Sequence, residues 1–165
     1  MQIGRSWVHC NVRLESKSIS NGFGIIPTSI YLLPMSKKLL ILACILAALA
    51  VILGAFGAHG LSQILSPKQL HTYEIGIRYH FYHAFAIFMV GLLSLQFQNN
   101  VWFKRAAYCF LTGIVGFSGS LYLLSCREIL GLTTYKWLGP ITPIGGTFFI
   151  IAWLLLAYGV RTIRE

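Results

Sequence analysis

Three histidines and one glutamate carry the chemistry that this sequence could perform. His80 and His83 stand three residues apart in "RYHFYHAF" (78–85), His59 ends an apolar run, and Glu74 lies between His59 and His80. Residues three apart share a helix face, so three imidazoles and a carboxylate could meet, the minimum for a transition-metal site. His59 with either partner could also hold a haem axially. The spacing matches neither H-E-x-x-H nor a Cys–His framework, and we predict no bound cofactor.

The same histidines have two further interpretations. His80 and His83 alternate with Tyr79, Phe81 and Tyr82, and aromatic residues with polar tips gather where a membrane meets water. We favour this structural interpretation, in which the imidazoles hydrogen-bond a neighbouring helix. Ionisable groups within a membrane span also mark proton pathways, so a proton-linked role stays open.

The composition is that of a membrane protein. Hydrophobic residues make up 56% of the 165 residues and charged residues only 10%, against about a quarter charged in soluble domains. With no Asp and four Glu, the chain offers little for two-carboxylate hydrolysis, and nothing else supports catalysis. The net charge of +9 is spread singly or in pairs, so we expect no nucleic-acid binding. The four cysteines show no C-x-x-C spacing and are interpreted as small buried hydrophobes.

Four apolar segments of membrane-spanning length follow one another, at 39–58, 79–97, 106–124 and 144–160. Twenty residues of helix cover about 30 Å, the thickness of the hydrocarbon core. Between the first two segments, Ser66 and Pro67 form a helix-start signal, and we predict a short amphipathic interfacial helix there. The predicted fold class is all-α: an integral membrane four-helix transmembrane bundle.

Residues 1–34 differ from residues 35–165, the predicted four-span domain. They are polar and aperiodic or broken by proline, and "MSKK" at the boundary resembles an ordinary start of a membrane protein. We interpret residues 1–34 as a weakly structured extension or an upstream-translated segment, with a short surface helix as the alternative. The first span also resembles a secretory signal, but Ala50, Gly54 and Ala58 place small residues four apart, as packed membrane helices do.

The distribution of basic residues predicts the orientation. Four spans put both termini and the middle loop on one face of the membrane. Basic residues on that face would be Lys37, Lys38, Lys104, Arg105, Arg161 and Arg164, and those on the opposite face would be Lys68, Arg78, Arg127 and Lys136. Lys and Arg are enriched on the cytoplasmic side, so we predict cytoplasmic termini. The opposite face collects most of the unusual residues, and we expect any site to lie there.

Two glycine-rich stretches predict close helix packing. "TGIVGFSGSLYLL" repeats small residues three and four apart, which lets helix backbones approach and lets Ser118 or Ser120 hydrogen-bond across. In "GPITPIGG", Thr142 is the expected N-cap of the fourth span and Pro143 its first residue. We favour packing over an anion site at this helix start.

Four motifs together resemble a known family. "GAFGAHGL", "YEIGIRYHFYHAFAI", "GFSGSLYLL" and "TPIGG", in this order and spacing, are similar to the YgdD- or YwdK-like small four-span membrane proteins, related to eukaryotic transmembrane protein 256. The resemblance covers residues 35–165 and implies an integral protein of the bacterial cytoplasmic membrane, with no assigned activity, substrate or cofactor. The matching family positions are Gly54, Gly57, His59, His83, Ser118, Gly119, Ser120, Tyr122, Thr142, Pro143, Gly145 and Gly146.

The predicted function follows from these features. We expect a non-enzymatic, small membrane component, with the lipid bilayer as its environment, that packs with itself as a homo-oligomer or with a membrane protein partner. The alternative is a metal- or haem-binding site, or a proton-linked transport subunit, that uses His59 and His83 with help from His80 or Glu74.

Overall fold

The computed structural model describes residues 35–98, 100–131 and 138–163. Its elements are α1 (Met35–His59), the short 3-10 helix η2 (Leu61–Gln63), α2 (Pro67–Gln96), α3 (Val101–Gly113), the π-helix η3 (Ile114–Ser118), α4 (Gly119–Ser125) and α5 (Leu138–Arg161). The described ranges contain no strand, so the all-α prediction is confirmed for them. The predicted N-terminal extension, residues 1–34, lies outside the described residues.

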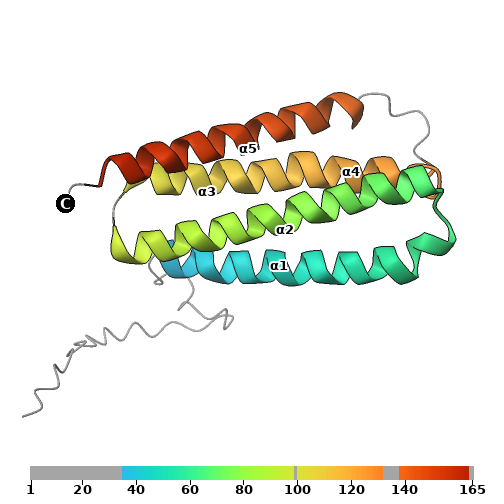
Figure 1. The fold of residues 1–165 in the computed structure, drawn as a ribbon, viewed down its shortest axis with the longest axis horizontal. Coiled ribbons are helices and arrows are strands. Elements are labelled where there is room, and N and C mark those ends of the chain that lie inside the picture. The colour runs from blue at the N-terminus through green and yellow to red at the C-terminus, as the bar shows by residue number, and fades with distance from the viewer. Residues whose placement is uncertain (1–34, 99, 132–137, 164–165) are drawn as a thin grey trace, which may run out of the picture.

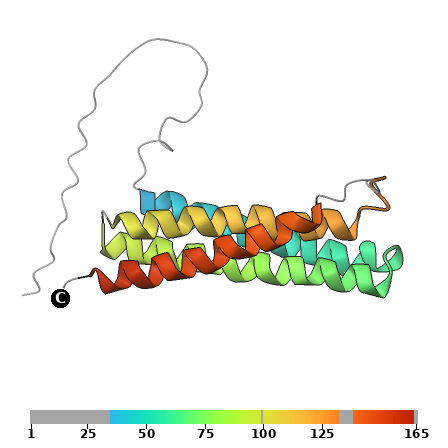
Figure 2. The same cartoon turned by 90° about the horizontal axis from the view of Figure 1, so that it is seen from above.

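Four helical rods lie side by side, because α3, η3 and α4 join into one continuous rod. Figure 1 shows them in chain order, with α1 and α5 at opposite edges. The main contacts accordingly join α1 to α2, α2 to the α3–α4 rod, and that rod to α5. Figure 2 shows the same rods from above, running lengthwise together, with the chain reversing at both ends. The start of α1, the end of α2, the start of α3 and the end of α5 share one end, called here the terminal end.

Helix α1 packs on α2 through a narrow stripe of small residues. Its buried residues are Ser36, Ala43, Ala50 and Gly57, each seven positions after the last. A seven-residue repeat keeps one line of contact along a pair of gently supercoiled helices. At Gly57 the approach is so close that a Cβ atom would lie 2.7 Å from the ring of Tyr73 on α2.

The predicted packing face of α1 is therefore only partly right. Ala50 belongs to the stripe, Gly54 is half-buried beside Ile77, and Ala58 is exposed. Large apolar residues on the other side of α1 are exposed as well, among them Ile41, Ile45, Val51, Ile52 and Phe56. In a bilayer such a surface faces lipid or another helix.

Helix α2 begins as predicted and then continues further than predicted. Ser66 is its N-cap, Gln69 completes a capping box, and Pro67 holds the first helical position. The predicted short interfacial helix is not confirmed as an element of its own, because α2 runs unbroken from Pro67 to Gln96. No proline interrupts the helix after its first residue. Gly76 lies within α2, and the ring of Tyr122 packs against it where a Cβ atom would otherwise be.

Helix α5 begins a full turn before the predicted position. Thr142 and Pro143 are not its N-cap and first residue but lie inside the helix, which starts at Leu138. Pro140 stands in the first turn, where its missing N–H would have had no partner in any case. The helix is therefore longer than the predicted span 144–160, and Thr142 is free to bond across to α4.

Three of the four rods are long and apolar enough to cross a membrane. They are Met35–Gln63, Val101–Ser125 and Gly139–Arg161. Helix α2 is not among them. Lys68, Glu74 and Arg78 lie in its first half, and polar residues such as His80 and His83 lower the hydropathy of its uncharged second half. By composition alone, the structure thus supports three of the four predicted spans.

Candidate functional site

The motif segments come together in one half of the structure, at the end opposite the terminal end. Four close approaches join them: Gly57 with Tyr73, Gly76 with Tyr122, Gly116 with Gly145, and Ser120 with Thr142. They connect α1 to α2, α2 to α4, η3 to α5 and α4 to α5. The two hydroxyls of the last pair lie 2.7 Å apart. The sequence prediction that unusual residues gather on this side agrees with these contacts.

His80 is buried between α2 and α4. Its side chain is 3% exposed, and its Nδ1 lies 3.1 Å from the hydroxyl oxygen of Tyr122. The Tyr122 ring in turn packs on Tyr73, with ring centroids 5.1 Å apart, and the Tyr73 hydroxyl donates to the carbonyl of Leu53 at 3.2 Å. Two hydrogen bonds joined by one ring contact, called here the polar chain, therefore link α1, α2 and α4.

His83 is buried too, but its environment is aromatic. Its ring stacks on Phe149 of α5 with centroids 3.5 Å apart and planes 6° from parallel, and Phe110 packs at 5.6 Å. Its Nδ1–H donates to the carbonyl of Tyr79 at 2.7 Å. These contacts make His83 a core residue that packs α2 against α3 and α5. Its hydrogen bond stays within α2 and does not reach a neighbouring helix, which the structural interpretation of the histidines had predicted.

His59 and Glu74 do not join the buried histidines. Both side chains are exposed, and within the described residues no three His, Cys, Asp or Glu side chains gather as metal ligands would. The metal and haem hypotheses therefore gain no geometric support from His59, His80, His83 and Glu74. The sequence analysis gave His80 only an assisting role, but His80 is the histidine that lies buried between α2 and α4 and contacts Tyr122.

Serine and glycine residues line the π-helical stretch between α3 and α4. The N–H of Gly119 bonds to the carbonyls of Ile114 and Gly116, so the helix is locally widened. Ser118 is fully buried at 0% exposure, whereas a Cβ on Gly119 would meet nothing within 4 Å. π-Helical turns occur frequently at functional sites.

The cysteines differ from their predicted environment. The three described ones are free thiols, and Cys44 is exposed while Cys109 and Cys126 are half-buried. Cys126 follows the end of α4 and packs near Leu61, Leu65 and Tyr73. Burial raises the pKa of the Cys126 thiol, so this thiol stays protonated at neutral pH.

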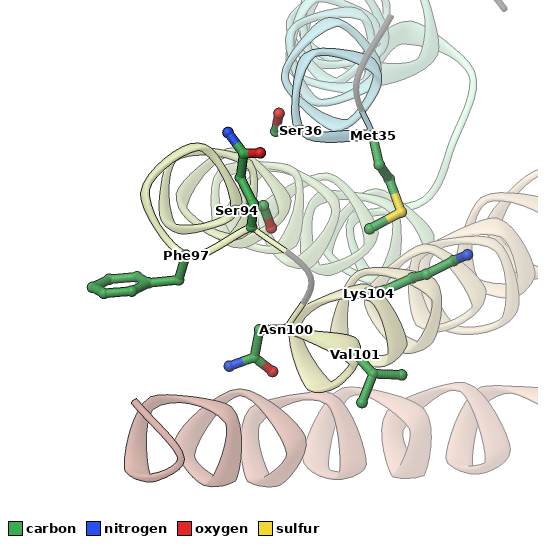
Figure 3. Close-up of a pocket in the computed structure, with 8 residues that line it drawn as sticks. Met35, Ser36, Ser94, Phe97, Asn100, Val101 and Lys104 are labelled. Carbon is green, nitrogen blue, oxygen red and sulfur yellow. The ribbon is translucent and has the colours of Figure 1, made fainter. Parts of the chain in front are cut away.

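The terminal end contains a pocket and a hydrogen bond between helices, neither of which the sequence analysis predicted. A pocket of about 470 Å³ opens there (Figure 3), lined by Met35, Ser36, Ser94, Phe97, Gln98, Asn100, Val101 and Lys104. Asn100 caps α3 and its side-chain amide donates to the carbonyl of Gly159 at 3.0 Å. This link ties the start of α3 to the end of α5, and it stabilises the end of the protein rather than forming a catalytic arrangement.

Comparison with known proteins fixes the family. The family model described as "Protein of unknown function (DUF423)" matches residues 53–146, more than half of the chain. The chain belongs to the DUF423 family. All the motif positions named from the sequence, from Gly54 to Gly146, fall within this match.

Relatives of the DUF423 chain are bacterial membrane proteins by name. The UPF0382 membrane protein YwdK of Bacillus subtilis is 43% identical over 120 residues, which is 73% of this chain and 93% of the relative. A UPF0382 membrane protein of Staphylococcus epidermidis is 45% identical over 120 residues, with 73% and 92% covered, and one of Haemophilus influenzae is 41% identical over 125 residues, with 76% and 94% covered. No solved structure matches the chain. The sequence-based resemblance to YwdK-like membrane proteins is thus confirmed.

Two features of the DUF423 site escaped the sequence argument. The sequence analysis did not single out Tyr73, although its ring fills the space beside Gly57. The available signal was Gly57 itself, because a glycine near the end of a span can mark a place where a large side chain packs against the helix. The π-helix at Ile114–Ser118 left no signal beyond the density of small residues, because its extra residue is absorbed by packing against α2 and α5.

Proposed function

We propose that this protein is a four-span integral protein of the bacterial cytoplasmic membrane, in which α2 crosses the membrane together with the three helical rods that are long and apolar enough to do so. Support comes from the pairing of α1 and α2. Gly91 packs on Leu40 near one end and Gly57 on Tyr73 near the other. The stretch of α2 between these contacts covers about 27 Å at the helical rise, which is close to the hydrocarbon thickness.

The charges on α2 are compatible with a span. Lys68 and Glu74 lie near its start, beyond or beside the Tyr73 contact, and Arg78 is exposed on the outer surface, from where its long side chain can reach the headgroups. The terminal end carries Lys37, Lys38, Lys104, Arg105 and Arg161. Positive charge favours the cytoplasmic side, so the terminal end lies on the cytoplasmic side in this proposal and the opposite end lies outside.

We further propose that the protein acts without catalysis, as a membrane component that assembles with a second copy of itself through α1. The observation that carries this proposal is the position of α1 at the edge, where it packs chiefly on α2 and buries only four small residues. An apolar hollow of about 170 Å³ lies beside it, lined by Ala43, Cys44, Ala47, Phe81, Ala84, Phe85 and Phe88. Small residues along such an edge allow another helix to approach closely.

Oxidative cross-linking at Cys44 tests this assembly. Cys44 is exposed on α1, so in a variant that keeps Cys44 as its only cysteine we expect a disulfide-linked dimer to form in native membranes. Cys44→Ser in that single-cysteine variant leaves no thiol, so it should form no disulfide-linked dimer and provides the control. Monomer alone under oxidation, at several expression levels, would contradict self-assembly through α1, whereas an adduct with a different membrane protein would assign this edge to a partner.

A further inference from the structure

Two polar side-chain atoms in the described part of the chain are buried and have no hydrogen-bond partner: His80 Nε2 and Ser118 Oγ. The side chains are 3% and 0% exposed. Burial of a polar group without a partner is unfavourable, most of all in a bilayer, where no bulk water can reach it. A native structure that keeps two such groups on packed helices requires an explanation.

The helix register places the two groups at the same level. Gly76 of α2 packs against Leu121 and Tyr122 of α4. His80 lies four residues after Gly76, and Ser118 lies four residues before Tyr122. Because these helices run in opposite directions, both steps lead one turn the same way along the interface, and residues four apart share a helix face.

The bond between His80 and Tyr122 supports this register. The Tyr122 ring of α4 packs over Gly76 of α2, and its hydroxyl lies 3.1 Å from His80 Nδ1, so the His80 imidazole reaches into the contact between α2 and α4. The Nε2 atom on the other side of the same imidazole is the one left without a partner.

Ser118 differs from Ser94 and Ser125, two other buried serines within helices. Ser94 and Ser125 donate to the carbonyls of Val90 and Leu121, four residues earlier, each at 2.8 Å, which is the usual way for a serine to be satisfied in a helix. Ser118 makes no such bond and ends the π-helix. Its hydroxyl is thus available to something outside its own helix.

We propose that His80 Nε2 and Ser118 Oγ together bind one water molecule inside the bundle. Water can donate to or accept from either group, so it fits both tautomers of His80, and buried waters typically satisfy such otherwise unpaired groups. A metal ion would lack ligands, since the described residues hold no group of three suitable side chains. An apolar occupant would leave both atoms unpaired. The result is a hydrogen-bonded relay from Tyr122 through His80 and water to Ser118.

The direct test is NMR of histidine-labelled, full-length protein in lipid nanodiscs. We expect magnetisation transfer from water to the His80 ring in the wild type, and its loss in Ser118→Ala. In Tyr122→Phe the transfer should persist, which excludes relay through the tyrosine hydroxyl. No transfer to His80 in the wild type, or transfer unchanged in Ser118→Ala, would overturn the proposal.

The sign of a stability change gives a second, independent test. If water bridges the two groups, Ser118→Ala removes a hydrogen bond and should lower the unfolding temperature. If the hydroxyl has no partner, the same change removes an unsatisfied group and should raise it, which would also overturn the proposal. Ser125→Ala, at an equally buried serine with its own helix carbonyl, measures the generic cost of losing a buried hydroxyl and provides the matched control.

Discussion

Gly145→Ala is expected to destabilise the protein more than any other single methyl group added to it. A Cβ at this position would clash with the backbone nitrogen of Phe117 and lie 2.6 Å from the carbonyl carbon of Gly116. These are backbone atoms of η3, so no rotamer change relieves the clash and α5 must move away from the α3–α4 rod. Overpacking of this kind typically costs up to about 3 kcal/mol. Unfolding in mixed detergent, followed by circular dichroism, measures the loss.

Two glycines of the same helix provide controls for this experiment. Gly139→Ala places its Cβ where nothing lies within 4 Å, and Gly146→Ala meets only the Phe117 ring at 3.5 Å. Both should unfold close to the wild type or be slightly more stable, because alanine favours helix over glycine. Equal stability of Gly145→Ala and Gly139→Ala would contradict the close contact between η3 and α5.

Tyr122→Phe is expected to cost about 1–3 kcal/mol of unfolding free energy, although it removes a single oxygen atom. The ring that packs on Gly76 and Tyr73 is kept, but His80 Nδ1 loses the hydroxyl that lies 3.1 Å away. The cost is that of leaving a buried polar group unpaired. Thermal unfolding in detergent measures the difference from the wild type.

Tyr82→Phe is the control for the tyrosine experiment. Tyr82 lies on α2 close to His80 in the sequence but is 57% exposed, so its hydroxyl should contribute little. If Tyr122→Phe were as stable as Tyr82→Phe, the polar chain through His80 would have no structural role and the account of this half of the bundle would be wrong.

Much of the fold could be predicted from local sequence signals. Ser66 and Pro67 mark the start of α2 because capping depends on neighbouring residues alone. The convergence of the motif segments followed from topology, since antiparallel helices must return each segment to the same end. The start of α5 was misplaced, because Pro140 and Pro143 are both compatible with a first turn.

The site itself was harder to predict, because burial depends on how a helix is rotated about its axis. His80 and His83 face inward, while His59 and Glu74 of the same half face outward. Sequence spacing shows which residues share a helix face, but not whether that face packs against another helix or faces outward. The π-helix adds to the difficulty, since its wider turn shifts the faces of Ser118 and later residues away from the regular helical repeat.

The four-span topology depends most on α2 crossing the membrane, and one labelling experiment tests this directly. Gln63 before α2 and Gln98 after it are both exposed. Each is replaced by cysteine in a chain whose native cysteines are changed to serine, and spheroplasts are treated with a membrane-impermeant maleimide. We predict that Gln63→Cys is labelled from outside and that Gln98→Cys is labelled only after the membrane is opened. Labelling of both from the same side would show that α2 does not cross the membrane and would contradict the four-span account.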